Sequence, residues 1–560
     1  MAASSLGLTK QAGALAEKRS RWQRFLQARA GKRPLPLGLT LAAGLVAAFV
    51  TIPLAYIAYR AAGGGVEVWQ RLAQNRLPGL LLNTLSLTGA VTMGTLVLGT
   101  SLAWLTERTD LPGRRAWRWL LAMPLAVPAF IGSAVHVALL RPRGGYLPVF
   151  LERVFGGPVP TPSPFGFWGA AFMLTIFMYP YVYLLSAAAF RSLPASLEEA
   201  ARSYGRGLWR TLWEVTLPTL KPGMGAGALL VALDILAEYG TVALLRYDTF
   251  SAAIFRQLSG RYDRSAASVL SGVLVALAIL ALWGEIRYQG QALYAHYSGH
   301  WRPAPVLSLG AWRGAAAAFV FGVTAASLLV PLAVLAVWTV QSVFDPSPMA
   351  EVFRSGSRGL WSFAWNSLWS SGLAALAAVA LSLPVAFLVV RVPRRVPRLL
   401  SRLCQVGYAL PGVVVALSLI LLVNRALPFL YATPLLVVLA YVIRHMPQAV
   451  RSSEAALAQV SPELEEAAHS LGRSSVKAFF QVTVPLILPG LLAGGALVFL
   501  TSLKELPATL LLRPAGFDTL AVRVWIGAGE GFYTQAAPAA LLLILSAAVP
   551  LYFLLRRERL

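Results

Sequence analysis

Two stretches of the chain decide its architecture: SLEEAARSYGRGLWRTLWEVTLP at residues 196–218 and SPELEEAAHSLGRSSVKAFFQVTVP at residues 461–485. Both contain Glu-Ala-Ala, a glycine a few residues later and a proline at the end. An offset of 267 residues brings Glu199 onto Glu466 and Gly205 onto Gly472. Similarity at a fixed offset indicates an internal repeat, so we expect two copies of one structural unit.

The repeat extends far beyond these two stretches. The same offset carries four further residues of the first copy, Pro218, Pro222, Glu238 and Arg246, onto Pro485, Pro489, Glu505 and Arg513. An offset of 283 carries three earlier ones, Asn83, Arg108 and Pro128, onto Asn366, Arg391 and Pro411. The offsets differ because the first copy has extra residues, a Pro- and Gly-rich stretch around 144–166.

Long apolar blocks separate these motifs. Hydrophobic residues make up 57% of the 560 residues and charged residues only 13%, whereas a soluble domain carries about 25% charge. A membrane-spanning helix needs about 20 apolar residues. Twelve blocks qualify as candidate spans, near 37–60, 79–105, 117–140, 166–190, 223–245, 266–286, 313–341, 363–390, 403–423, 432–450, 489–510 and 535–555. We therefore expect an all-α integral membrane protein with about 12 transmembrane helices in two parallel six-helix repeats.

The distribution of positive charge predicts the orientation of these spans. The net charge of +25 could suggest nucleic acid, but it is spread over the gaps between apolar blocks, so we expect no nucleic-acid partner. With the N-terminus in the cytoplasm, the inner segments hold 29 Lys and Arg residues and the outer ones 14. The positive-inside rule then places both termini in the cytoplasm.

Four segments follow along the chain. Residues 1–36 are basic and lack the features of a signal peptide, so they are expected to form a cytoplasmic tail. Two transmembrane domains, each embedded in the lipid bilayer, are expected at 37–286 and 313–556. A cytoplasmic linker at 287–312 would join them. The single cysteine, Cys404, excludes an internal disulfide and a Cys-based metal site.

The two decisive stretches lie in the longest inner loop of each copy. Each is typical of a short helix, a glycine break and a second helix that ends near proline. Ser196 with Glu199 predicts a capping box, and Ser461 followed by proline predicts another good helix start. Gly205 and Gly472 would allow the chain to turn. Two matched short helices on one side of a membrane suit docking to a cytoplasmic partner.

Glu-Ala-Ala, three further residues and Gly, then Leu-Pro or Val-Pro about a dozen residues on, resembles the cytoplasmic loop of permease subunits of binding-protein-dependent ABC importers. The resemblance covers nearly the whole chain, as two type I permease units fused in tandem. It implies that the loop supplies a coupling helix for an ATPase subunit. The ATPase-coupling residues that it implies are Glu199, Ala200, Gly205, Glu466, Ala467 and Gly472.

The chain contains no G-x-x-x-x-G-K-[ST] phosphate-binding loop. It is therefore expected to be a transport subunit and not an enzyme, with no cofactor of its own. ATP would be bound by a separate ATP-binding-cassette ATPase, expected in two copies. A separate extracytoplasmic substrate-binding protein would deliver the solute at the bacterial inner membrane.

Charged residues inside the predicted spans are candidates for the translocation path. Asp234 and Glu238 lie in the fifth span, and Lys504 and Glu505 in the matching part of the eleventh. Ionisable groups are costly in a bilayer and usually face a path or a partner. The alternative is that these groups lie at the interface or form structural pairs, and Arg444 in the tenth span stays open in the same way. The sequence identifies no metal ligands.

Two further stretches bear on the solute. Residues 504–525, KELPATLLLRPAGFDTLAVRVW, and 238–250, EYGTVALLRYDTF, resemble the matching parts of ferric-iron importer permeases. Thiamine and phosphonate importers use similar fused permeases, so these solutes remain alternatives. A secondary transporter driven by an ion gradient would not need two matched cytoplasmic loops. A membrane enzyme would need a cluster of acidic or histidine residues in a loop, and no loop has one.

Overall fold

The computed structural model describes residues 36–157, 159–289, 306–344, 359–392 and 394–557. Within these ranges the chain is helical, and strand pairing is limited to an isolated bridge between Thr109 and Leu307. The predicted all-α class is confirmed for this part of the chain. The expected tail at 1–36 and linker at 287–312 lie largely outside the described residues.

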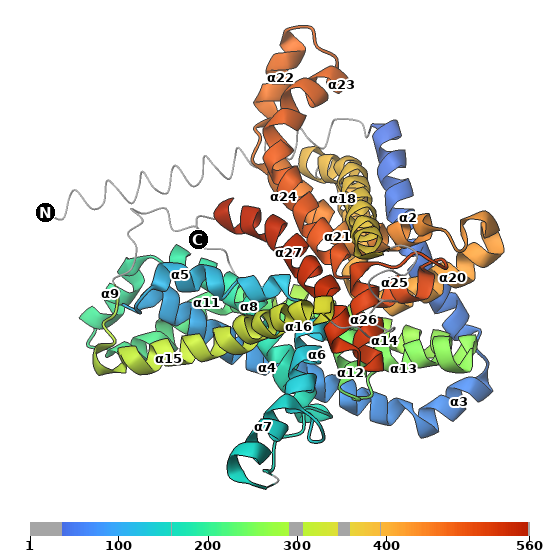
Figure 1. Ribbon diagram of the computed structural model, residues 1–560. Coiled ribbons are helices and arrows are strands. Elements are labelled where there is room, and N and C mark those ends of the chain that lie inside the picture. The colour runs from blue at the N-terminus through green and yellow to red at the C-terminus, as the bar shows by residue number, and fades with distance from the viewer. Residues whose placement is uncertain (1–35, 158, 290–305, 345–358, 393, 558–560) are drawn as a thin grey trace, which may run out of the picture. The chain divides into compact units, whose positions relative to one another are not determined.

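The elements of the first copy are α2 (Leu37–Ala62), α3 (Val66–Asn75), α4 (Leu77–Arg108), α5 (Arg114–Leu120), η1 (Met123–Ala126), α6 (Ala129–Leu140), α7 (Tyr146–Phe155), α8 (Phe167–Ser192), α9 (Ala195–Ser203), α10 (Leu208–Thr211), η2 (Leu212–Thr216), α11 (Leu217–Ala237), α12 (Gly240–Leu244), α13 (Phe250–Arg256), η3 (Gln257–Arg261) and α14 (Arg264–Gln289). The long helices α4, α8 and α11 pack against one another (Figure 1).

The elements of the second copy are η4 (Gly310–Trp312), α15 (Arg313–Thr324), η5 (Ala325–Leu329), α16 (Val330–Phe344), α18 (Gly359–Arg391), α19 (Arg395–Gln405), η6 (Val406–Ala409), α20 (Gly412–Ala426), η7 (Pro428–Leu430), α21 (Pro434–Ala458), α22 (Pro462–Ser470), α23 (Ser475–Ala478), η8 (Phe479–Thr483), α24 (Val484–Leu503), α25 (Pro507–Leu512), α26 (Leu520–Glu530) and α27 (Tyr533–Arg557). Both η2 and η8 are π-helical turns of five residues.

Eleven of the twelve predicted spans correspond to candidate membrane spans of the described residues. Nine are helices long and apolar enough to cross a membrane, and two are bent helix pairs. The predicted span at 432–450 corresponds to α21, which is not among these candidates and carries polar residues such as Arg444 and His445. Its 25 residues extend over about 37 Å at 1.5 Å per residue. It begins 267 residues after α8, so it is the repeat counterpart of that span.

The third and ninth predicted spans are not straight. Residues 114–126 and 129–140 meet at 92°, and residues 395–408 and 412–426 meet at 107°. A proline lies at each break, Pro128 and Pro411, and both prolines have extended backbone conformations. Because proline lacks an N–H and restricts the residue before it, a helix commonly ends there. The bend is therefore a repeated feature of the two copies.

The described residues form two compact units that do not follow the boundary between the copies. Unit 1 contains described residues of 36–52, 375–407 and 445–498, and unit 2 those of 53–374, 408–444 and 499–557. In unit 2, the helices that begin the second copy pack on first-copy elements: η5 contacts α8, and α16 contacts α6. Unit 2 therefore includes helices from both copies.

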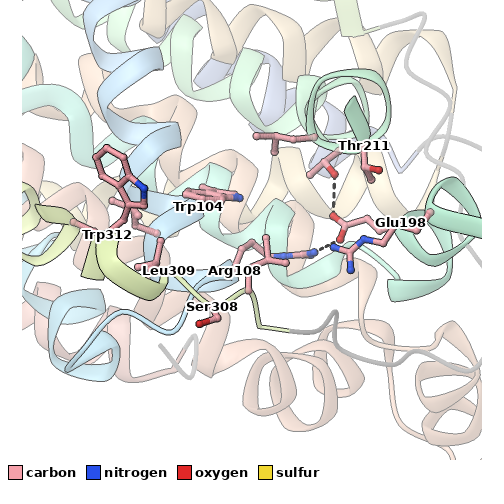
Figure 2. A pocket seen from close by; sticks show the side chains of 13 residues that line it. Trp104, Arg108, Glu198, Thr211, Ser308, Leu309 and Trp312 are labelled. Carbon is pink, nitrogen blue, oxygen red and sulfur yellow. Dashed lines mark hydrogen bonds and ion pairs between the residues drawn. The ribbon is translucent and has the colours of Figure 1, made fainter. Parts of the chain in front are cut away.

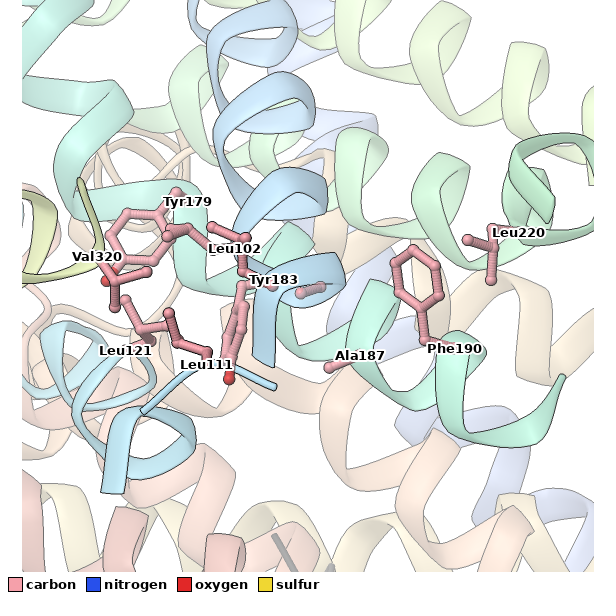
Figure 3. Packing of buried hydrophobic residues seen from close by; sticks show 11 residues of the cluster. Leu102, Leu111, Leu121, Tyr179, Tyr183, Ala187, Phe190, Leu220 and Val320 are labelled. Carbon is pink, nitrogen blue, oxygen red and sulfur yellow. The ribbon is translucent and has the colours of Figure 1, made fainter. Parts of the chain in front are cut away.

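Each unit has its own apolar core. In unit 2 the core lies between α4, α8 and neighbouring segments and includes Leu102, Tyr179, Tyr183 and Val320 (Figure 3). Tyr179 and Tyr183 are fully buried there, which identifies them as packing residues. In unit 1 a smaller core joins α18 and α21 to α24.

Candidate functional site

The two conspicuous loops fold into the same series of elements. We call residues 195–216 the first loop segment and residues 462–483 the second. Each has a nine-residue helix (α9 or α22), a glycine, a short helix (α10 or α23) and a π-helical turn, and every boundary is shifted by 267 residues. The glycines after the first helices, Gly205 and Gly472, have φ of +77° and +79°. A Cβ there would meet nothing within 4 Å, so glycine is required by backbone conformation and not by space.

The starts of α9 and α22 differ. Ser461 is the N-cap of α22, and its hydroxyl accepts a hydrogen bond from the N–H of Glu463 at 3.3 Å, as the sequence predicted. The capping box predicted for Ser196 and Glu199 is wrong. The N-cap of α9 is Pro194, without a side-chain cap, and Ser196 already lies in the first turn. The repeat places Pro194 opposite Ser461, and its extended backbone lets the helix begin at the next residue.

The predicted coupling residues lie on the outer side of these helices. Glu199 and Ala200 of α9 are exposed, as are Glu466 and Ala467 of α22. The carboxylate that faces inward is the preceding residue in each copy. Glu198 is buried with 4% exposure, and Glu465 is partly buried.

These inner carboxylates belong to two matched groups, which we call the first polar triad (Arg108, Glu198, Thr216) and the second polar triad (Arg391, Glu465, Thr483). In the first, Glu198 pairs with Arg108 and accepts a hydrogen bond from the Thr216 hydroxyl at 2.8 Å. In the second, Glu465 accepts hydrogen bonds from Arg391 Nη2 at 2.9 Å and from the Thr483 hydroxyl at 3.0 Å. Sequence reasoning missed both carboxylates, although the 18-residue separation of Glu and Thr is the same in both copies.

The polar triads fix each loop helix to two long helices. Arg108 is the last residue of α4, and Arg391 is the last residue of α18. Thr216 and Thr483 are the last residues of the π-helical turns that lead into α11 and α24. A buried charge is stable only when paired, so a displacement of α9 or α22 must be transmitted to the long helices or break the triad.

The charged residues predicted for the translocation path converge in unit 2. Asp234 lies in α11 and interacts electrostatically with Arg444 and Lys504. Lys504 Nζ also donates a hydrogen bond to the backbone oxygen of Leu125 at 2.8 Å. Glu505 is 5% exposed and pairs with Arg444 at 3.1 Å. Arg444, which the sequence left open, is thus a central member of the group.

Two of the four residues predicted for the path, Glu238 and Glu505, do not lie inside a long helix as predicted. The fifth and eleventh spans were expected to continue to 245 and 510, but α11 ends at Ala237 and α24 at Leu503. Glu238 and Glu505 follow these ends and accept hydrogen bonds from the N–H groups of Thr241, at 2.7 Å, and Ala508, at 3.3 Å. The carboxylates therefore cap the short helices α12 and α25, where a negative charge is favourable. The helices α11 and α24 therefore end before the predicted span ends, and the chain continues in the short helices α12 and α25.

Within the described ranges, no group of three or more His, Cys, Asp or Glu side chains is arranged to hold a metal ion. The cluster in unit 2 is instead a mixture of opposite charges. Asp234, Glu238 and Glu505 provide three carboxylates, and Arg444 and Lys504 provide two cationic groups. Of these groups, Arg444 and Glu505 form an ion pair.

Comparison with known proteins agrees with the duplicated architecture. The model of the family described as binding-protein-dependent transport system inner membrane component matches twice, at residues 95–284 and 378–557. The Fe(3+)-transport system permease protein FbpB 2 of Haemophilus influenzae is 34% identical over 531 residues, covering 93% of this chain and 98% of the relative. The ferric transport system permease protein FbpB of Actinobacillus pleuropneumoniae is 25% identical, covering 87% of this chain and 72% of the relative.

A shorter relative matches only part of the chain. The molybdenum transport system permease protein ModB of Escherichia coli is 32% identical over 208 residues, which cover 36% of this chain and 89% of ModB. The difference in coverage agrees with the fusion of two units in one polypeptide. The chain therefore belongs to the family of binding-protein-dependent transport system inner membrane components, as a multi-pass permease in which the family unit occurs twice in tandem.

Proposed function

We propose that this permease imports ferric iron delivered by an extracytoplasmic binding protein, and that a separate ATPase drives the transport. The observation that carries the proposal is the matched pair α9 and α22, each fixed to two long helices by a polar triad. Two equivalent helices with exposed outer sides suit two copies of one ATPase subunit. Movement of the ATPases would then be transmitted through the polar triads to the spans.

The residues that would dock the ATPase are those exposed on the two helices and the glycines that end them. They are Glu199, Ala200 and Gly205 in the first loop segment and Glu466, Ala467 and Gly472 in the second. ATP would be bound by the partner, since the sequence has no phosphate-binding loop of its own. This proposal puts both termini and both loop segments in the cytoplasm, with permease domains at 37–286 and 313–556.

Iron is the solute that the comparisons support best. The two long relatives are named as Fe(3+) and ferric transport permeases, and the first aligns over almost its whole length. We infer that Asp234, Glu238, Lys504 and Glu505 line the translocation path. Hard cations such as ferric iron prefer oxygen ligands, which carboxylates provide.

The test is uptake into proteoliposomes that contain this chain, its co-purifying ATPase and its binding protein. Radiolabelled ferric iron is offered in parallel with thiamine and a phosphonate, with and without internal ATP. We expect ATP-dependent accumulation of iron. ATP-dependent uptake of another solute would refute the iron assignment, and uptake that does not depend on ATP would refute the ATPase coupling and favour a secondary transporter.

The docking sites are tested with a pair of charge reversals. Glu199→Lys combined with Glu466→Lys should release the ATPase from the purified complex, because both substitutions change the exposed sides of α9 and α22. The matched control is Glu152→Lys, which reverses an exposed carboxylate on α7 that belongs to neither loop segment. Retention of the ATPase by the double variant would contradict the proposed docking site.

A further inference from the structure

A cavity of about 580 Å³ lies beside the first loop segment within unit 2 (Figure 2). Three parts of the chain form its walls: the end of α4, the residues from α9 to η2, and the residues 307–316 that begin the second copy. The lining includes two cationic side chains, Arg108 and Arg202, and two indole rings, Trp104 and Trp312. The first polar triad lines part of the cavity, but its contacts give no role to the remaining lining residues.

The charge of the lining favours an anion. Glu198 is the only carboxylate of the lining in the described part of the chain, and both of its oxygens are already engaged, one by Arg108 and the other by Thr216. Arg108 is almost fully buried, yet its Nη1 has no hydrogen-bond partner among the residues that the structure describes. With Arg202, the lining carries one more positive than negative charge. A buried charged donor without an acceptor is costly, so an anionic group near Arg108 would be stabilising.

Asp110, a carboxylate two residues after Arg108, does not cancel this charge. Asp110 follows α4 closely but accepts hydrogen bonds from the N–H of Leu309, at 2.9 Å, and from the guanidinium of Arg313. These interactions hold the pKa of Asp110 well below its usual range. Asp110 thus stays ionised, and its charge is matched by Arg313.

Apart from Thr211, Thr216 and Ser308, the rest of the lining is apolar. Leu105, Leu212, Leu307 and Leu309 contribute alkyl side chains. Arg108 ends a 32-residue helix that is long and apolar enough to cross a membrane, so the cavity lies beside one end of a candidate span. Trp312 is 74% exposed, so the lining reaches the surface there. Tryptophan is enriched near the ends of membrane spans because its ring is amphipathic.

We propose that this cavity binds the anionic headgroup of a membrane phospholipid. The phosphate would be held by Arg108 and Arg202, and the start of an acyl chain would lie along Trp104, Leu309 and Trp312. Such a lipid would contact both α9 and the start of the second copy.

The second copy provides an internal comparison, because its equivalent residues differ. Phe387 and Phe479 stand where the first copy has Trp104 and Leu212, and their rings pack edge to face with centroids 5.5 Å apart. Arg391 Nη1 donates a hydrogen bond to the backbone oxygen of Val460 at 3.0 Å, so it does not need an external acceptor. His469 stands in place of Arg202. We therefore expect one lipid site per chain and not two.

The test measures lipid binding to the purified full chain by native mass spectrometry. Phosphatidylglycerol is titrated against the zwitterionic phosphatidylcholine. The wild type should bind one phosphatidylglycerol at least about tenfold more tightly than phosphatidylcholine. Both headgroups carry a phosphate, but phosphatidylcholine would also bring its choline cation to a lining with net positive charge, where like charges repel. Arg202→Gln should lose about tenfold in affinity, and Leu212→Phe, which puts the second-copy residue into the cavity, should remove the site.

His469→Gln is the matched control and should bind phosphatidylglycerol like the wild type. Arg202 is exposed, so its variant tests the proposal even if Leu212→Phe fails to fold. Equal binding of the two lipids, or full binding by Arg202→Gln, would overturn the proposal. A competition with glycerol phosphate separates the two sources of phosphate: failure to displace the lipid supports a lipid site, and displacement at similar concentration would overturn it in favour of a small-anion site.

Discussion

Replacing Glu198 by glutamine removes one charge from the first polar triad while keeping the size of the side chain. The side chains of Arg108 and Glu198 are 4% and 6% exposed, so Arg108 would be left buried without a counter-charge. Breaking a buried ion pair from one side costs about 3–5 kcal/mol. Glutamine can still bond to Thr216, so we expect the lower value, about 3 kcal/mol.

This loss should appear as local opening of α9. About 3 kcal/mol corresponds to roughly a hundredfold increase in the opening equilibrium, and amide hydrogen exchange reports such openings directly. Peptides that cover α9 should therefore exchange about a hundredfold faster in Glu198→Gln than in the wild type. Peptides from α22, in the other copy, should be unchanged.

Two variants make the comparison specific. Glu199→Gln changes the exposed neighbour of Glu198 and should leave the exchange of α9 unaltered. Glu465→Gln should accelerate the amide hydrogen exchange of α22 by only about tenfold. The smaller effect is expected because Glu465 is 15% exposed and Arg391 keeps its hydrogen bond to the Val460 oxygen. If Glu198→Gln exchanged like the wild type, or if Glu199→Gln were equally fast, the polar triad would not be what holds α9.

Three further changes test other features. Gly205→Pro should uncouple ATP hydrolysis from uptake in proteoliposomes, since proline cannot adopt the φ of +77°; normal uptake would contradict this. Gly412→Ala should lower the melting temperature, because its Cβ would lie 2.2 Å from Glu505 Oε1 and would disturb the ion pair between Glu505 and Arg444. In the control Gly314→Ala, the added Cβ meets nothing within 4 Å, so this variant should melt like the wild type. Asp110→Asn should destabilise the chain by the same amount from pH 5 to 8. A carboxylate whose pKa is lowered in the folded protein stabilises the fold at every pH above its unfolded pKa of about 3.9, and this stabilisation is lost only as the pH falls below that value. A difference in melting temperature that changed between pH 5 and pH 8 would contradict the assignment.

The repeat made much of the fold predictable. A run of apolar residues and a fixed offset depend on local sequence, so the spans, the tandem copies and the turns at Gly205 and Gly472 followed from the residues alone. The bends at Pro128 and Pro411 did not, because proline in a membrane helix is compatible with a gentle kink as well as with a turn of 92° or 107°.

The inner carboxylates show where sequence reasoning reaches its limit. In Glu198-Glu199 and Glu465-Glu466, two adjacent acids are chemically equivalent in the sequence, and only the orientation of the helix decides which one is buried. The partners Arg108 and Arg391 are 90 and 74 residues away. Arg444 posed the same difficulty, because its partner Glu505 lies far along the chain, in the break between α24 and α25.

The π-helical turns η2 and η8 bear on the history of the chain. A π-turn holds one residue more than the α-helical turn it replaces, so it arises most simply from the insertion of a single residue. The two turns occupy equivalent positions, and each ends with the threonine that bonds to the inner carboxylate. The matching turns and their threonines agree with the duplication of one unit that already contained them.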